Sequence, residues 1–235
     1  MIERTILTSQ QENYTIASED PSVVEWFTNA ENQTDTILKQ INTDRMYDPI
    51  FQGRKDMVVI DLGANAGLFS LYAQDSATQV IAVEPAPITF AVLTELTKEH
   101  NNVTIVNAAV SNSNETVPFY LNENSTTNSL VSHNGKRIDV PGVTIADLIK
   151  EHNLAQVDFV KCDIEGSELL AITDETLEPV KDIVKFWFVE LHQTNNDTAS
   201  WPGNLEANRQ QIKAIFERHG YETDTVIHDQ LFAWR

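Results

Sequence analysis

The sequence predicts an α/β fold built on a mainly parallel sheet. From Met57 onward, short apolar runs alternate with stretches of helical periodicity, and this order places parallel strands side by side through right-handed helical crossovers. The first apolar run ends in a turn of small residues, as the first strand of a doubly wound sheet does. The 235 residues are enough for one large core. We therefore expect one main domain at 57–235, preceded by an extension at 1–56.

The individual elements follow from the spacing of apolar residues and from turn signals. Strands are expected at 57–62, 79–85, 103–110, 157–164 and 184–192, and helices at 67–75, 88–100, 144–154, 166–173 and 210–221. Two more strands, at 116–121 and 137–143, flank a long polar loop of the kind that is often functional. The chain should end in a hairpin at 223–235. In the extension, helical patterns at 22–30 and 34–51 predict a helical cap.

Composition and charge exclude several classes of protein. Asp and Glu number 35 against 16 Lys and Arg, which gives a net charge of −19, and such a surface repels nucleic acid and anionic membranes. The N-terminus lacks the apolar stretch of a secretion signal, and no later run has the length of a membrane span. The single cysteine, Cys162, has no partner for an intrachain disulfide. We expect a cytoplasmic protein with a small-molecule partner; its oligomeric state is not indicated.

The turn after the first strand has the features of a cofactor-binding loop. Small residues stand at Gly63, Asn65 and Gly67 in the stretch VVIDLGANAGLFSLYA at 58–73, and the free N–H groups of the following helix point toward such a loop. Glycine adopts a positive φ without a clash, and asparagine tolerates it. Glu84 ends the next strand about 20 residues later, where an acid reaches the ribose hydroxyls of a nucleoside. The spacing differs from G-x-G-x-x-G, which weakens a nicotinamide interpretation.

Five segments carry a resemblance to a known family: VVIDLGANAGLFSLYA, VIAVEPAPITFAVL, VTIVNAAVS, VTIADLIKEHNLAQVDFVKCDIEGSE and FVELH. In their order and spacing, the chain resembles FkbM-type S-adenosylmethionine-dependent methyltransferases from about residue 56 to 192. The most specific segment is VKCDIEGSE. The resemblance implies a Rossmann-like class I methyltransferase fold: a seven-stranded, mostly parallel sheet with helices on both faces and an antiparallel last strand. It also implies O-methylation of a sugar, lipid or polyketide-like metabolite, whereas the unmatched segment before Asp56 leaves the acceptor unassigned.

The resemblance further implies where S-adenosylmethionine would bind. Asp61 and Gly63 would face the methionine end of the cofactor, and Glu84 would bind the ribose. Asn107 and Ala108, at the end of the third strand, would lie beside the adenine ring, where small residues leave room for a flat base. Together with the loop positions already described, these residues form the expected cofactor site.

The carboxyl ends of the fourth and fifth predicted strands carry the candidate catalytic residues. Strand alternation puts Lys161 and Asp163 on one face, and Glu165 follows at the edge where a substrate enters. Glu190 and His192 share a face of the next strand. We expect these five residues to form the catalytic site, with Asp163 also contacting the cofactor.

Two roles are open for this group. His192 has the unperturbed pKa of a general base near neutral pH, and Asp163 or Glu190 is able to orient it or to replace it. Alternatively, these three residues bind a divalent cation that lowers the pKa of the acceptor hydroxyl. Two carboxylates and one imidazole are an incomplete set for a hard cation, so the metal is not favoured and no ligands are assigned. Glu168 is expected only to stabilise the start of the helix that Gly166 opens.

The favoured function is therefore S-adenosylmethionine-dependent O-methylation of a small or medium-sized hydroxyl compound. Two alternatives remain at this point. One is a nicotinamide-dependent oxidoreductase, because Glu84 would serve either cofactor. The other is a methyltransferase-like binding module without catalytic activity.

Overall fold

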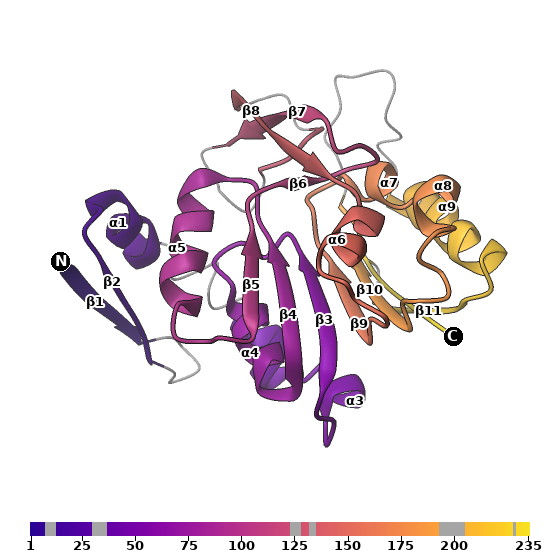
Figure 1. Cartoon of the computed structure of the whole chain (residues 1–235), viewed down its shortest axis with the longest axis horizontal. Coiled ribbons are helices and arrows are strands. Elements are labelled where there is room, and N and C mark those ends of the chain that lie inside the picture. The colour runs from indigo at the N-terminus through magenta and orange to yellow at the C-terminus, as the bar shows by residue number, and fades with distance from the viewer. Residues whose placement is uncertain (8–12, 30–36, 123–127, 132–134, 193–204, 228) are drawn as a thin grey trace.

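The computed structural model describes residues 1–7, 13–29, 37–122, 128–131, 135–192, 205–227 and 229–235. At its centre is a seven-stranded sheet of order β11-β12-β10-β9-β3-β4-β5 (Figure 1). Its strands are β3 (Met57–Leu62), β4 (Ala77–Val83), β5 (Val103–Val106), β9 (Phe159–Cys162), β10 (Phe186–Glu190), β11 (Glu222–Ile227) and β12 (Gln230–Trp234). β5, β4, β3, β9 and β10 are parallel, and β12, the last strand, is antiparallel to both of its neighbours. The predicted sheet is confirmed.

Helices cover both faces of this sheet, because its strands are apolar on both sides. The helices are α4 (Leu68–Ala73), α5 (Pro87–Thr97), α6 (Ile145–Glu151), α7 (Glu168–Ala171), α8 (Asp174–Leu177) and α9 (Leu205–Arg218), with a short 3-10 turn, η2, at Gln74–Ser76. Ile60 and Val160 pack against Leu148 of α6 and Phe216 of α9 on one face. On the other face, Val59, Phe159 and Phe188 pack against Phe69 of α4. The chain leaves β3 toward β4 and later returns to β9 on its other side, so the strand order reverses between β3 and β9.

The N-terminal extension is not wholly helical. It opens with an antiparallel hairpin, β1 (Ile2–Leu7) and β2 (Asn13–Ser18), which the helical-cap prediction did not include. The predicted helix after Asp20 is present as α1 (Pro21–Asn29). The described part of the second helical pattern, 37–51, contains a π-helical turn, η1 (Lys39–Thr43), and α3 (Asp48–Phe51), and residues 34–36 of this pattern lie outside the described residues.

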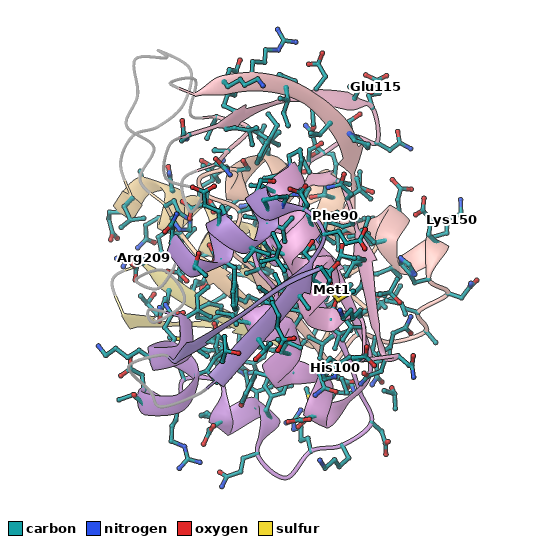
Figure 2. The ribbon with its side chains drawn as sticks, turned by 90° about the vertical axis from the view of Figure 1, so that its left-hand side faces the viewer. Met1, Phe90, His100, Glu115, Lys150 and Arg209 are labelled. Carbon is teal, nitrogen blue, oxygen red and sulfur yellow. The ribbon has the colours of Figure 1, made fainter. Side chains whose placement is uncertain are left out.

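The extension packs on the main domain in two places. Figure 2 shows the hairpin nearest the viewer, with α5 behind it. Ile16 of β2 and Phe27 of α1 pack with Val92 of α5. Farther along the chain, Tyr47 and Phe51 join the aromatic core beneath β3 and β9, Tyr47 lying 4.8 Å from Phe69 between ring centroids. The extension therefore shares its core with the sheet, and the division at residue 56 stays a prediction.

A second, smaller sheet lies beyond the carboxyl ends of the main strands. It has the order β6-β8-β7 and consists of β6 (Ala109–Val110), β7 (Thr116–Leu121) and β8 (Lys136–Val143). β7 and β8 are the antiparallel pair predicted around the polar loop. The single strand predicted at 103–110 is wrong: it ends at Val106, and Ala109 and Val110 pair with β8. In the part of the chain that the structure describes, no helix has the length and apolar character needed to cross a bilayer.

Asp158 joins the starts of three central strands. Its Oδ2 accepts a hydrogen bond from the backbone N–H of Val58 (3.0 Å), and its Oδ1 accepts hydrogen bonds from Lys185 Nζ (3.0 Å) and Gln156 Nε2 (2.8 Å). Burial alone would raise the pKa of Asp158, but the bonds from Val58 and Lys185 outweigh it and hold the pKa below its usual value. The ionised carboxylate therefore stabilises the folded chain at neutral pH.

Replacing Asp158 by Asn should lower the free energy of unfolding by about 1–2 kcal/mol at pH 7. Because the pKa is lowered in the folded protein, this stabilisation is complete above the unfolded pKa of about 4 and is lost as the pH falls through the folded value. Urea denaturation of parent and variant at pH 7 and at decreasing pH measures the difference. The exposed Asp139→Asn serves as control and should change stability by less than about 0.5 kcal/mol. A parent–variant difference that stays constant into acid would contradict this role.

Candidate active site

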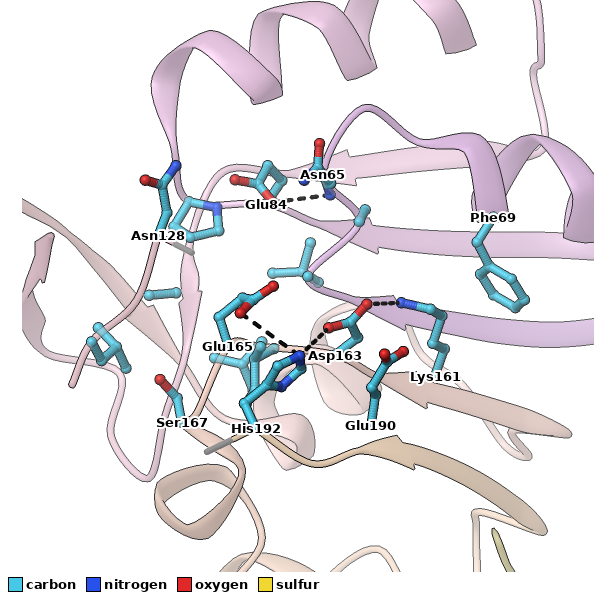
Figure 3. A pocket seen from close by; sticks show the side chains of 18 of the residues that line it. Asn65, Phe69, Glu84, Asn128, Lys161, Asp163, Glu165, Ser167, Glu190 and His192 are labelled. Carbon is cyan, nitrogen blue, oxygen red and sulfur yellow. Dashed lines mark hydrogen bonds and ion pairs between the residues drawn. The ribbon is translucent and has the colours of Figure 1, made fainter. Parts of the chain in front are cut away.

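A cavity of about 300 Å³ lies at the carboxyl ends of the central strands, next to the point where the strand order reverses (Figure 3). Eight of the predicted site residues line it: Gly63, Asn65, Glu84, Lys161, Asp163, Glu165, Glu190 and His192. Four others do not line it: Asp61, Gly67, Asn107 and Ala108. The fold thus brings most of the predicted cofactor-binding and catalytic residues to one cavity.

The turn after β3 approaches β9 so closely that only glycine fits at position 63. Gly63 has a φ of +80°, and a Cβ atom placed there would lie 1.8 Å from the carbonyl oxygen of Asp163. Asn65 has a φ of +50°, as its type allowed us to expect, and its side-chain oxygen accepts a hydrogen bond from Ala66 N (2.7 Å). The backbone of this turn therefore forms one bare wall of the cavity.

Glu84 holds that turn in place from the end of β4. Its Oε2 accepts a hydrogen bond from Asn65 N (3.0 Å), while its Oε1 accepts from Ala86 N (2.9 Å) and Thr89 Oγ1 (2.7 Å). The side chain is largely buried, and this burial raises the pKa of Glu84. A carboxylate has about four acceptor positions, so one remains for a ligand in the cavity that Glu84 lines.

Three of the four predicted residues outside the cavity wall make contacts in the structure around it. Asp61 is fully buried and accepts a hydrogen bond from Ser70 Oγ (2.6 Å). Gly67 precedes α4 with a φ of +88°, and a Cβ there would lie 2.4 Å from a methyl carbon of Leu93, so it permits helix packing. The amide of Asn107 donates to the Glu84 carbonyl oxygen (2.8 Å).

Ala108 is buried in the main hydrophobic core. The next two residues, Ala109 and Val110, line the cavity in its place. Ala109 and Val110 line the cavity instead of Ala108 because the chain leaves the central sheet after Val106, before β6 begins.

Lys161 and Asp163 form a buried ion pair at the floor of the cavity, with Lys161 Nζ 2.8 Å from Asp163 Oδ2. Burial favours the neutral amine, but the charge of Asp163 outweighs it, and the pKa of Lys161 lies above its usual value. In turn, burial would raise the pKa of Asp163, and the charge of Lys161 lowers it below the usual range. Lys161 therefore keeps Asp163 ionised and fixes Oδ2, while Oδ1 faces His192.

His192 is surrounded by carboxylates. Its Nδ1 lies 2.9 Å from Glu168 Oε1, and its Nε2 lies 3.6 Å from Asp163 Oδ1 and 3.7 Å from Glu165 Oε2. Burial would lower the pKa of His192, but the hydrogen bond and charge of Glu168 and the charge of Asp163 raise it well above 6.5. The carboxylates around His192 therefore favour its protonated form, which makes it a weaker candidate for the general base than its unperturbed pKa indicates.

Glu168 has a larger role than the predicted one. Its Oε1 accepts a hydrogen bond from Gly166 N (3.0 Å), which confirms the expected contact at the start of the helix. The same oxygen contacts His192, 24 residues away, and the side chain is almost fully buried. Sequence reasoning missed this contact because the pairing depends on how β10 lies beside the turn after β9.

Glu165 and Glu190 are carboxyl groups whose ionisation is disfavoured. Burial raises the pKa of Glu165 to about 8, and it raises the pKa of Glu190 to about 7 with a further contribution from the charge of Asp163. Glu165 has a φ of +54°, and its carbonyl oxygen accepts a hydrogen bond from Ser129 Oγ (2.6 Å). Among the described residues, no hydrogen bond or ion pair engages the carboxylate of Glu190, which lies between Lys161 and His192 in Figure 3.

Other residues of the cavity wall come from segments to which no role was assigned. Ile37 and Gln40 belong to the N-terminal extension, and Phe119, Asn128 and Leu130 to the segment between β6 and β8. For Asn128 and Leu130 the only signal was the long polar loop in which they lie. Ile37 and Gln40 lie in the helical pattern predicted at 34–51, and Phe119 in the strand predicted at 116–121. No local pattern shows that these segments meet above the central strands.

Comparisons with known proteins identify the family of the chain. A family model described as the Methyltransferase FkbM domain matches residues 61–223. The chain belongs to this family. This FkbM-family chain is similar to Methyltransferase sdnD of Sordaria araneosa, with 28% identity over 226 residues that cover 79% of this chain and 81% of that protein.

A second relative of this FkbM-family chain is 31-O-demethyl-FK506 methyltransferase FkbM of Streptomyces tacrolimicus. It is 26% identical over 238 residues, covering 84% of this chain and 85% of the relative. Among solved structures, a SAM dependent methyltransferase from Aquifex aeolicus aligns with a TM-score of 0.43 and 15% identity, over 92% of this chain and 93% of that one. Membership of a methyltransferase family decides against the nicotinamide oxidoreductase alternative.

Proposed function

We propose that this FkbM-family chain transfers the methyl group of S-adenosylmethionine to a hydroxyl group of a small or medium-sized metabolite. The observation that carries the proposal is a single cavity with two different walls. One wall is the bare turn at Gly63 with the carboxylate of Glu84, and the other holds Asp163, Glu165 and Glu190. The relative named 31-O-demethyl-FK506 methyltransferase supports transfer to oxygen.

The residues on the first wall fit the proposed cofactor. The missing Cβ of Gly63 leaves the backbone open to the cavity, and Glu84 keeps an acceptor position for a ribose hydroxyl. Ala109, a small residue on the wall, leaves room for a flat ring. S-adenosylmethionine, when bound, supplies a methyl carbon made electrophilic by the sulfonium to which it is attached.

The residues on the second wall orient the acceptor and remove its proton. In the transfer, the acceptor oxygen forms a bond to the methyl carbon as the carbon–sulfur bond breaks, and the electron pair of that bond stays on sulfur. The proton of the hydroxyl passes to the carboxylate of Glu190, which makes no hydrogen bond or ion pair with any described residue and lines the cavity. Asp163, held ionised by Lys161, provides a fixed hydrogen-bond acceptor for orientation.

The activity is tested by incubating the protein with S-adenosylmethionine and a panel of sugars and polyketide-like alcohols, with matched amines and thiols as controls. We expect formation of S-adenosylhomocysteine together with a methyl ether detected by mass spectrometry. We also expect S-adenosylmethionine, and not NAD, to raise the melting temperature. Binding without transfer to any acceptor would favour the binding-module alternative, and methylation of amines alone would contradict transfer to oxygen.

Replacing Glu84 by Gln should raise the Kd of S-adenosylmethionine by about 10–100-fold, because hydrogen bonds to a charged group are worth about 1.5–3 kcal/mol. Isothermal titration calorimetry measures this change. Thr89→Val is the matched control: it removes one of the hydrogen bonds to Glu84 but does not touch the cavity, so its Kd should stay within about 3-fold of the parent. An unchanged Kd in the Glu84→Gln variant would show that Glu84 does not bind the ribose.

A further inference from the structure

The Nε2 atom of His192 faces a gap between two carboxylates. It lies 3.6 Å from Asp163 Oδ1 and 3.7 Å from Glu165 Oε2, and hydrogen bonds between nitrogen and oxygen span about 2.7–3.2 Å. These three ligand atoms all lie within 4.8 Å of one another. A cation with bonds of about 2.0–2.2 Å to such atoms holds them roughly 3.0–3.5 Å apart. The two distances to Nε2 exceed this spacing by only a few tenths of an ångström, and the two carboxylate oxygens, which lie within 4.8 Å of each other, would close around the ion.

The opposite side of the imidazole ring is fixed as in a metal-bound histidine. Nδ1 lies 2.9 Å from Glu168 Oε1, and Gly166 N holds the same oxygen. A carboxylate that accepts the Nδ1 proton leaves the Nε2 lone pair available and sets the ring orientation, which is the usual support of a histidine ligand. In Figure 3, Nε2 is directed at Asp163 and Glu165.

Ser167 provides an independent observation that the same wall takes a ligand. Its side chain is 2% exposed, its Oγ has no hydrogen-bond partner among the described residues, and it lines the cavity. In Figure 3, Ser167 lies near His192, with its oxygen on the side away from the imidazole ring. A buried hydroxyl needs a partner, and because no described residue supplies one, a ligand in the cavity that Ser167 lines is the candidate partner.

The histidine at position 219 provides the contrast. It also lies between two carboxylates, but each of its ring nitrogens has one of its own, Asp174 Oδ1 at 3.0 Å and Glu178 Oε2 at 3.0 Å. Both nitrogens are within hydrogen-bond distance, so this surface cluster leaves no gap for an ion.

We propose that Asp163, Glu165 and His192 bind one divalent cation at the acceptor side of the cavity. An imidazole with two carboxylates suits a cation of intermediate hardness such as Mn²⁺ or Zn²⁺ better than Mg²⁺. Lys161 fixes the other oxygen of Asp163, so that Oδ1 is the atom left for the ion. Glu165 replaces Glu190 in the ligand set considered from the sequence, and Glu190 stays free.

The ion would occupy the position of a proton on Nε2 and, with three protein ligands, keep open positions toward the cavity. An acceptor hydroxyl bound there has a lowered pKa and gives its proton to Glu190 more readily. This role of the ion rests on the proposed methyl transfer, whereas its binding does not.

The test uses chelator-treated full-length protein without S-adenosylmethionine, titrated with MnCl₂ and followed by the electron paramagnetic resonance signal of free Mn²⁺. We expect one bound Mn²⁺ per chain. His192→Ala and the isosteric Glu165→Gln should each weaken binding by at least about 30-fold, and Glu168→Gln by about 10–100-fold. His219→Ala, the matched control, should bind as the parent does. Circular dichroism spectra show that each variant is folded.

The outcomes separate this proposal from the proposed function. No stoichiometric binding of Mn²⁺ or Zn²⁺, or equal losses in His192→Ala and His219→Ala, would overturn the cation site whether or not the protein methylates alcohols. Full methyl transfer by the chelator-treated protein would overturn the role of the ion and leave the function standing. Tight binding that the cluster variants lose, in a protein that transfers no methyl group, would support the site and refute the function.

Discussion

Replacing Glu190 by Gln should lower the turnover number by about 10²–10⁴-fold, the usual contribution of a general base. The Kd of S-adenosylmethionine should change by less than about 3-fold, because Glu190 lies on the wall opposite Gly63 and Glu84. Glutamine keeps the shape of the side chain but does not take up the proton of the acceptor hydroxyl. Steady-state kinetics of methyl ether formation, together with calorimetric titration of the cofactor, separates the two effects.

A loss of stability does not account for that result, because the Glu190→Gln change should not destabilise the folded protein. Burial, aided by the charge of Asp163, raises the pKa of Glu190 to about 7, so the ionised carboxylate opposes folding above that pH and a neutral amide does not. Glu175→Gln, the same change at an exposed position on α8, is the control and should keep the parent turnover. A Glu190→Gln enzyme that works at the parent rate would remove Glu190 from the proposed proton transfer.

The Gly63→Ala variant should lose cofactor binding and at least about 3 kcal/mol of its free energy of unfolding. The new Cβ would lie 1.8 Å from the carbonyl oxygen of Asp163 and 2.9 Å from its carbonyl carbon, both backbone atoms. The end of β9 or the turn itself must therefore move, which costs about 1–3 kcal/mol or more in a packed core. The positive φ of +80° adds about 1–2 kcal/mol. Urea denaturation and cofactor titration measure both losses.

The Gly53→Ala variant separates the effect of the positive φ from the effect of the close contact. Gly53 has a similar φ of +74°, but no atom lies within 4 Å of the position of its Cβ. This variant should lose only the conformational part, about 1–2 kcal/mol, and should bind S-adenosylmethionine as the parent does. Equal losses in the two alanine variants would show that the close approach of Gly63 to Asp163 has no importance for stability.

Those parts of the fold that depend on local periodicity could be predicted from the sequence. The runs that became β3, β4, β9 and β10 are apolar on both faces, and only a central parallel strand buries both. The positive φ of Asn65 followed from its residue type and neighbours. The position of Glu84 followed from its distance along the chain from Gly63, and the structure places both at the cavity.

What the sequence did not reveal depends on contacts between distant segments. The altered pKa of His192 depends on Glu168, and the candidate cation set depends on the left-handed turn at Glu165, which brings that carboxylate to the histidine. Likewise, Ala109 lines the cavity instead of Ala108 because two residues after β5 lead the chain into another sheet. A periodic pattern carries no information on any of these contacts.

The hydrogen bond from Ser129 to the main-chain carbonyl of Glu165 has a consequence for substitutions around the cavity. It joins the segment between β7 and β8 to the rim of the active site through a backbone atom, which is present whatever side chain stands at 165. Phe119 and Leu130, by contrast, pack in one hydrophobic cluster with Ala86, whose backbone N–H donates to Glu84, so a change of these side chains reaches the framework of the cavity.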